Sequence, residues 1–274
     1  MPGDRVRITV EDHVAEVALA RGEKHNALDG EMFVAVAGAA ERLASEPGLR
    51  AVVLYGEGPS FCSGIDVGWL AGGQAEGFSE HARQRDSSGA NLFQRVATAW
   101  AGVPVPVIAS IHGNCLGGGL QIALGADIRI ASAEAKLSVR EVHWGLVPDM
   151  GITATLPRVV ALDVAKELTF TGRLVTGEEA AGLGLVTSTA ADPLAAARSL
   201  ASGIAGRSPD AVRAAKQLFD TSWPGAGPDG LVLESELQFG LLGTPNQMAA
   251  VIAGVNGDPA EFTDPEPPSR STGT

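Results

Sequence analysis

The chain has 274 residues, enough to bury a sizeable core as one large domain or as a domain with an appendage. Its net charge of −12 argues against a general binder of nucleic acid or of an anionic membrane surface. Two cysteines, Cys62 and Cys115, do not make a disulfide framework, and the acidic first twenty residues do not resemble a signal peptide. A soluble, cytoplasmic protein is therefore expected, with neither a nucleic-acid partner nor a membrane span.

Hydrophobic periodicity predicts the elements of the first half of the chain. Strands are expected where apolar residues alternate or form short runs, and Asp29 is placed to cap the helix that follows it. The polar, glycine-bearing stretch 71–90 is predicted to be mobile. The expected elements are two strands within 5–20 around a turn at Glu11–Asp12, a helix after Asp29, a strand at 51–56, a helix near 91–101 and a strand at 103–113.

The second half begins with short elements of both kinds and then becomes helical. Beyond Pro193 the sequence is rich in alanine at helical spacing. Short strands alternating with helices predict a parallel-type α/β core, followed here by a helical extension. The expected elements are a helix that opens after the glycines within 116–127, helices at 152–171, 176–184, 192–208, 210–220, 231–242 and 246–256, and strands at 128–132, 136–139 and 185–187.

Two glycine-containing turns follow predicted strands. Ser63–Gly64 comes after the strand at 51–56, and Gly117, Gly118 and Gly119 open a helix. Backbone N–H groups at such junctions can point into a pocket, and two of them from separate loops make an oxyanion hole. The alternative is that both segments are simply tight turns.

Two carboxylates flank an apolar stretch downstream. Glu141 and Asp149 could move protons between carbon atoms if both lined one pocket. Two structural interpretations compete with this one: Glu141 could form a surface ion pair with Arg140, and Asp149 could cap a helix that starts near Met150. No histidine pair has metal-ligand spacing, so no metal is expected.

Four segments together resemble the enoyl-CoA hydratase/isomerase (crotonase) superfamily. The first, Ser60 to Asp66, reads SFCSGID and is similar to the family signature SFxAGxD. The order and spacing of the segments make the resemblance specific from about residue 5 to residue 190. The other three are Ile111–Gly119, similar to a strand followed by xGxxxGGG; Ala126–Ala131, similar to CDxxxA; and 170–186, similar to TGxxxxAxEAxxxGLV.

This resemblance implies an α/β fold, a crotonase-like spiral of ββα units with a helical C-terminal trimerisation region. The implied division is a core with the acyl-CoA site at 1–195, a helical oligomerisation region at 196–260 and a disordered tail at 261–274. It also implies a homotrimer or a hexamer built as a dimer of trimers. Coenzyme A would be part of the thioester substrate, and no separate cofactor is expected.

The resemblance assigns roles to the glycine-containing turns. Ser63 and Gly118 would donate backbone N–H groups to the thioester oxygen and stabilise an enolate. Glu141 matches the second catalytic glutamate of the family's hydratases, but Gln121 stands where their first glutamate lies. A neutral amide donates a hydrogen bond and cannot take up a proton, so hydration by two glutamates is not expected.

The stretch 139–151 resembles the dienoyl-CoA isomerase branch, whose motif reads KEVxxGLxxDxG. The resemblance implies that Asp149 takes the C2 proton of a 3,5-dienoyl thioester and that Glu141 returns a proton at C6. Gln121 stands where that branch has a third acidic residue. His143 and Trp144, next to Glu141, are expected to line the pocket with Gln121, although His143 could simply pack.

The segment 21–28 resembles the family's RPxxxNAL stretch, which implies contacts to coenzyme A. Lys24 would contact an ADP phosphate, although a solvated loop lysine is nearly as good an interpretation. Ala27 belongs to the same stretch, and Ile65 and Asp66 would lie near the adenine and pantetheine. Lys216, in the C-terminal helical region, is a further candidate for a phosphate contact.

Three functions remain open at this stage. The first is isomerisation of a 3,5-dienoyl-CoA to a 2,4-dienoyl-CoA by Glu141 and Asp149. The second is hydration of a 2-enoyl-CoA, or 3,2-isomerisation, by Glu141 alone. The third is an acyl-CoA-binding protein without catalytic activity.

Overall fold

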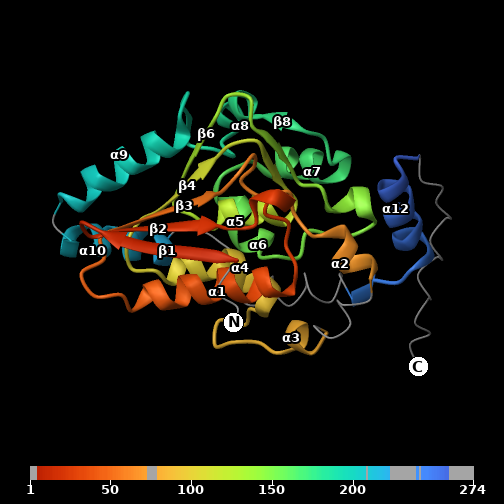
Figure 1. Ribbon diagram of the computed structural model, residues 1–274, viewed down its shortest axis with the longest axis horizontal. Helices are drawn as coiled ribbons and strands as arrows, with labels where there is room; N and C mark the ends of the chain where they lie inside the picture. The colour runs from red at the N-terminus through yellow and green to blue at the C-terminus, as the bar shows by residue number, and fades with distance from the viewer. Residues whose placement is uncertain (1–4, 73–78, 208, 223–238, 241, 259–274) are drawn as a thin grey trace.

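The computed structural model describes residues 5–72, 79–207, 209–222, 239–240 and 242–258. A six-stranded sheet with the order β1-β2-β3-β4-β6-β9 forms its centre (Figure 1). β1 is antiparallel to β2, and every other neighbouring pair in this sheet is parallel, which confirms the predicted parallel-type core. The strands are β1 (Val6–Glu11), β2 (Val14–Leu19), β3 (Ala51–Gly56), β4 (Val107–Ile111), β6 (Ile128–Ala131) and β9 (Ser188–Thr189).

A second, three-stranded sheet has the order β5-β7-β8 and contains β5 (Asn114–Leu116), β7 (Lys136–Ser138) and β8 (Val175–Thr176). β4 and β5, followed by helix α5 (Gly118–Leu124), make one ββα unit, and β6 and β7 begin the next. The chain thus steps from the large sheet to the small one and back, as expected for a crotonase-like fold. β5 and β8 were not among the predicted strands; β8 has only two residues, which is too few to show a period.

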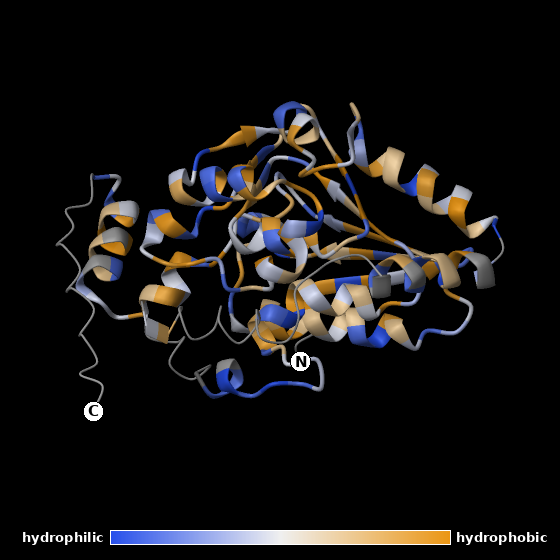
Figure 2. Cartoon of the chain, turned by 180° about the vertical axis from the view of Figure 1, so that it is seen from behind, coloured by the Kyte–Doolittle hydropathy of each residue, from blue (hydrophilic) through white to orange (hydrophobic). Residues whose placement is uncertain are grey.

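Helices cover both faces of the large sheet (Figure 1). On β3, Val52 and Leu54 point into the main core, which also contains α1 (Gly30–Ala44) and α4 (Leu92–Thr98). The alternate residues of β3 face Ala197 and Ala201 of α9 (Pro193–Ala205). Successive side chains of a strand point to opposite faces, so a strand buried on both sides reads as a continuous apolar run. Figure 2 accordingly shows hydrophobic residues concentrated along the strands.

The helix after Asp29 begins where predicted. The Asp29 carboxylate accepts the Met32 N–H at 2.9 Å and so caps α1. The remaining α-helices are α2 (Val67–Ala71), α3 (Ser79–Arg83), α6 (Ile152–Thr155), α7 (Leu162–Thr171), α8 (Gly177–Leu183), α10 (Pro209–Ser222) and α12 (Pro245–Asn256); the 3₁₀ turns are η2 (Gly22–Lys24), η4 (Ala99–Gly102), η5 (Glu141–Trp144) and η6 (Leu156–Arg158).

Two predicted elements were wrong in detail. The single helix expected at 152–171 is divided into α6, η6 and α7, and Pro157 lies at the break, where its missing N–H cannot continue a helix. The strand expected at 185–187 lies at 188–189 instead. Leu185, within the expected strand, instead accepts a hydrogen bond at its carbonyl from Arg129 Nε at 2.8 Å.

The predicted boundary between residues 195 and 196 falls inside α9, which packs on the sheet of its own chain.

Three of the predictions lie wholly or partly outside the described residues: part of the 71–90 stretch, most of the helix expected at 231–242 and the tail 261–274. Within the described ranges, no helix combines the length and apolar character needed to cross a membrane.

The contact between α4 and α5 gives a test of packing. A Cβ on Gly125, at the end of α5, would lie 2.1 Å from the Ala97 carbonyl oxygen of α4. Because backbone atoms cannot move aside cheaply, Gly125→Ala should lower the free energy of unfolding by roughly 1–3 kcal/mol in urea denaturation. Gly38→Ala is the matched control, because an added Cβ on this glycine of α1 meets no atom within 4 Å. It should stabilise by about 0.5–1 kcal/mol, and equal effects of the two variants would refute this view of the helix contact.

Candidate active site

A buried asparagine holds the two loops that begin the site. Asn26 donates from Nδ2 to the carbonyls of Ser60 at 2.8 Å and Phe61 at 3.1 Å, and its Oδ1 accepts the Arg21 N–H at 2.8 Å. Asn26 has a φ of +55°, a conformation that asparagine tolerates better than most residues. The segment 21–28 is therefore fixed against the loop that follows β3.

The hydrogen bonds of this loop correct one sequence prediction. The Ser63 N–H donates to the His25 carbonyl at 2.9 Å, so it is already engaged and the predicted oxyanion role for Ser63 is wrong. Leu28 N–H donates to Gly64 at 2.8 Å, and Asp66 N–H donates to Leu28 at 2.9 Å, which makes an isolated parallel bridge between Leu28 and Ile65. Because peptide groups alternate along an extended chain, the Ile65 N–H points away from Leu28. No described acceptor takes it.

The triple-glycine turn lies directly against this loop. Gly117 donates its N–H to the Ser138 carbonyl at 2.9 Å, and α5 starts at Gly118, whose N–H precedes the helix ladder. Gly64 has a φ of +88°, and a Cβ there would lie 2.8 Å from the Leu116 carbonyl oxygen and 3.7 Å from the Gly118 nitrogen. Only glycine allows the loops of Ile65 and Gly118 to approach this closely.

Glu141 places its carboxylate beside the same turn. Only 9% of Glu141 is exposed, and its Oε1 accepts a hydrogen bond from Gln121 Nε2 at 2.6 Å. A Cβ on Gly117 would lie 3.3 Å from that oxygen. Oε2 is buried and has no hydrogen-bond partner among the described atoms. Burial raises the pKa of Glu141 to about 7, although nearby backbone amides and the Gln121 hydrogen bond favour the charged form.

The competing interpretation of Glu141 as a surface ion pair is wrong. The Arg140 guanidinium instead donates to the Gly172 carbonyl at 2.9 Å, and the Ser138 hydroxyl donates to the same oxygen at 2.9 Å. Arg140 thereby anchors the chain just before Glu141 and leaves the carboxyl group facing α5.

Asp149 reaches the same neighbourhood through Gln121. The Gln121 Oε1 accepts the N–H of Met150, the next residue after Asp149, at 2.9 Å. The Met150 sulfur also lies close to Gly118, since a Cβ there would be 2.6 Å from it. Asp149 is half-buried, and the N-cap position of α6 belongs to Gly151. Glu141, Gln121 and the segment 149–150 thus form one connected group.

His143 and Trp144, both expected to line the pocket, lie on the turn that carries Glu141. The Trp144 ring packs against α12: a Cβ on Gly254 would come within 2.2 Å of it. His143 is largely exposed, with its ring 5.2 Å from that of Trp144. The loss of part of its hydration and the charge of Arg140 lower its pKa. The pair therefore links the turn of Glu141 to the C-terminal helix.

The residues predicted to contact coenzyme A share two adjoining loops. Lys24 is exposed at the end of η2, and the Ala27 carbonyl accepts a hydrogen bond from Arg21 at 2.8 Å. Ile65 forms the isolated parallel bridge with Leu28, the residue that follows Ala27. Asp66 caps α2 and pairs with Arg21 at 2.8 Å. Burial raises its pKa, but the hydrogen bond and charge of Arg21 together with the backbone amides of α2 outweigh burial, and the net shift is downward. These loops adjoin the turn of Gly117 and Gly118.

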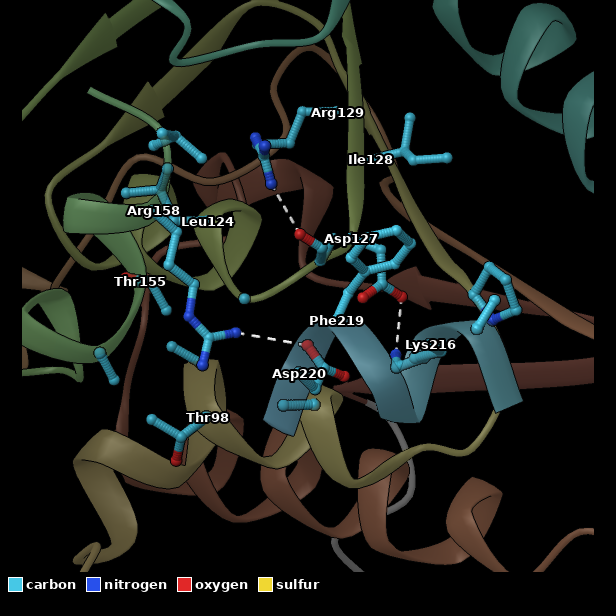
Figure 3. A pocket seen from close by; sticks show the side chains of 18 of the residues that line it. Thr98, Leu124, Asp127, Ile128, Arg129, Thr155, Arg158, Lys216, Phe219 and Asp220 are labelled. Carbon is cyan, nitrogen blue, oxygen red and sulfur yellow. Dashed lines mark hydrogen bonds and ion pairs between the residues drawn. The ribbon is translucent and has the colours of Figure 1, made fainter. Parts of the chain in front are cut away.

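Lys216 is not available for a phosphate, so this prediction is wrong. Its side chain is 7% exposed and pairs with Asp127 at 2.6 Å (Figure 3). It borders a cavity of about 780 Å³ between α10 and the core, where Arg158 also pairs with Asp220 at 3.3 Å. None of the predicted catalytic residues lines that cavity, which touches the far end of α5 at Leu124 and Gly125.

Sequence reasoning missed several supporting residues. Ile65 was identified as a ligand contact and not as an N–H donor, and Arg21 and Met150 were not singled out. Asn26 stood within the segment that resembles RPxxxNAL, so its motif was the available signal. The N–H of Met150 left no mark in the sequence because every residue except proline has one.

The raised pKa of Glu141 makes a prediction about stability. A carboxyl group that holds its proton more tightly when folded loses stability as pH rises from its unfolded pKa, about 4.3, through its folded pKa of about 7. Glu141→Gln removes this dependence. We expect the variant to be about 1–3 kcal/mol more stable than the wild type at pH 8 and no more stable below pH 5. Urea unfolding at both pH values measures this, and a difference independent of pH would contradict it.

Comparison with known proteins places this geometry in a family. Residues 9–255 match the enoyl-CoA hydratase/isomerase family. A peroxisomal Δ(3,5)-Δ(2,4)-dienoyl-CoA isomerase of Arabidopsis thaliana is 34% identical over 223 residues, 78% of this chain and 80% of that protein. A mitochondrial methylglutaconyl-CoA hydratase of Mus musculus is 33% identical over 189 residues, 67% of this chain and 57% of that protein.

A solved structure gives the same result for the fold. An enoyl-CoA hydratase/isomerase from Mycobacterium paratuberculosis superposes with a TM-score of 0.83 at 25% identity, covering 91% of this chain and 98% of that one. The chain therefore belongs to the enoyl-CoA hydratase/isomerase family, an enzyme family that acts on acyl-CoA thioesters.

Proposed function

We propose that this enzyme isomerises a 3,5-dienoyl-CoA to a 2,4-dienoyl-CoA, with Glu141 and Asp149 as the proton carriers. The observation that carries the proposal is the buried Glu141 carboxyl group beside the Gly117–Gly118 turn. Its pKa of about 7 lets it hold a proton at neutral pH, as a general acid must. Similarity to the dienoyl-CoA isomerase of Arabidopsis thaliana supports the same reaction.

The thioester oxygen would accept hydrogen bonds from Ile65 and Gly118. The two N–H groups belong to loops in direct contact, and neither has an acceptor among the described residues. An α-proton of a thioester is too weakly acidic for a carboxylate base unless the enolate oxygen is held by fixed donors. Each such donor typically lowers the barrier by about 3–4 kcal/mol.

The reaction then needs two groups that begin in opposite protonation states. Asp149, ionised, removes a proton from C2, and the electrons delocalise into a trienolate that extends from the thioester oxygen to C6. Glu141, protonated, delivers its proton to C6 and leaves double bonds at C2 and C4. Two carriers are required because C2 and C6 lie too far apart for one side chain.

A second candidate uses Glu141 alone as a base, in hydration of a 2-enoyl-CoA or in 3,2-isomerisation. The hydrogen bond from Gln121 to Glu141 favours it, since an amide donor stabilises the ionised carboxylate that a base needs and cannot itself take a proton. Similarity to the methylglutaconyl-CoA hydratase of Mus musculus supports hydration. A third reading, thioester binding without catalysis, applies if neither activity is found.

Substitution of the two carboxylates separates these candidates. Asp149→Asn and Glu141→Gln should each lower kcat for the 3,5-dienoyl substrate by about 10²–10⁴-fold, the usual contribution of a positioned acid or base. Ultraviolet absorbance of the conjugated product measures the rate. Glu178→Gln, on the exposed surface of α8, is the control and should retain full activity. Undiminished turnover by Asp149→Asn would reject the two-carboxylate mechanism.

The pH dependence gives an independent discrimination. If Glu141 must begin protonated, kcat/KM should fall as pH rises through about 7. If Glu141 is instead the base of the second candidate, kcat/KM should rise through the same range. Rates measured between pH 5.5 and 8.5 with a dienoyl and a 2-enoyl thioester therefore show which role it has.

We also propose that the chain assembles into a homotrimer or a hexamer through α12. Met248, Ile252 and Val255 are 46%, 56% and 61% exposed and recur at the spacing of one helical face. Such a face is expected to be covered by another subunit.

Placing a charge on this face should disrupt the assembly. Ile252→Glu should reduce the mass measured by light scattering to that of one chain, because a carboxylate would be buried in an apolar contact. Val34→Glu, equally on an exposed helix face in α1, is the control. An assembly that survives Ile252→Glu would show that α12 does not form the interface.

A further inference from the structure

We infer that Gln121 is a positioning residue that makes the two oxygens of Glu141 unequal: Oε1 serves only as an acceptor, and Oε2 alone carries the proton. The catalytic use of that proton rests on the proposed function, but the inequality of the two oxygens does not. It follows from the hydrogen bonds around the buried amide.

The orientation of the Gln121 amide is fixed by Met150. A backbone N–H can only donate, so the atom of Gln121 that lies 2.9 Å from the Met150 nitrogen must be the amide oxygen. The amide nitrogen must then face Glu141, 2.6 Å away. A flipped amide would set two donors against each other at Met150.

This orientation determines where a proton can sit on Glu141. An amide NH₂ group has no lone pair to accept a hydrogen bond, so a hydroxyl at Oε1 would face a donor. The proton therefore goes to Oε2, which is buried and lacks a partner among the described atoms. A partnerless oxygen remains available to a substrate carbon, whereas Oε1 is held in either protonation state.

The same helix positions the second half of the site. The Gln121 N–H donates to the Gly117 carbonyl at 3.1 Å in the first turn of α5, and the Gly118 N–H begins that turn. Gln121 is 1% exposed, so packing fixes its rotamer. One short segment therefore sets both the proposed oxyanion donor and the free oxygen of Glu141.

The charged groups around Glu141 do not explain the difference between its two carboxyl oxygens. α5 and α12 carry no charged residues. Arg140 is bound to Gly172, and His143 is exposed. α7, which also contacts this turn, contributes charged side chains that are all exposed to solvent: Asp163, Lys166 and Glu167. Half-buried Asp149 lies beyond the Gln121 contact.

Infrared difference titration of the full-length protein tests the inference directly. The protonated carboxyl band of Glu141 is identified by its loss in Glu141→Gln. Gln121→Met keeps the length of the side chain but removes the donor to the carboxylate. We expect the midpoint of the Glu141 band to rise by about one to two pH units, because a hydrogen bond to the charged form is lost. The midpoint of the pH–rate profile should move with it.

Two further variants keep the test decisive. Gln121→Glu preserves an acceptor for Met150 but turns a donor into an acceptor, so the two carboxyl groups should share a proton and release it at higher pH than the wild type. Gln247→Met removes another buried glutamine, on α12, and should leave the Glu141 band unchanged.

The outcomes separate this inference from the proposed function. An unchanged Glu141 midpoint in a folded Gln121→Met, or in Gln121→Glu if the first variant does not fold, overturns the positioning role. The expected shift in a protein without isomerase activity supports the positioning role and rejects the proposed reaction.

Discussion

The hydrogen bond from Gln121 to Glu141, 2.6 Å long and buried, is the interaction on which the rest of the site depends. It joins α5, which begins with the triple glycine, to the 3₁₀ turn that carries the carboxylate. Through its other end Gln121 also fixes Met150 and so the segment that contains Asp149. A buried amide that is hydrogen-bonded at both its nitrogen and its oxygen favours one arrangement over several. Three separate parts of the chain thereby acquire a common geometry.

The site is built at the expense of local stability. Burial of Glu141 disfavours its charge, and the absence of a partner for Oε2 among the described residues leaves that atom ready for a substrate. The rest of the fold compensates for this with close contacts. Asn26 binds two loops together, and Gly64 lets the Ile65 loop touch the start of α5. A carboxyl group with a pKa of about 7 and two N–H groups on touching loops are the parts that the proposed enolate chemistry requires.

Much of the fold could be predicted from the sequence, because alternation in β1 and β2, the apolar run of β3 and the Asp29 cap are local signals. β8, with two residues, was too short to show a period. At the site, residue types were predicted better than their partners. Ser63 and Ile65 stand in the same motif, and only the direction of each N–H distinguishes them. No local sequence signal gave Lys216 a partner, but in the structure it pairs with Asp127, a residue 89 positions away.

Solvent isotope incorporation tests the central claim most directly. The purified enzyme is supplied with a 3,5-dienoyl-CoA in deuterated water, and the product is analysed by mass spectrometry and nuclear magnetic resonance. If Glu141 delivers a solvent-exchanged proton, the 2,4-dienoyl product carries deuterium at C6, and Glu141→Gln abolishes this incorporation. A product without deuterium at C6, or conversion only of a 2-enoyl-CoA to its hydrated form, would contradict the two-carboxylate isomerase.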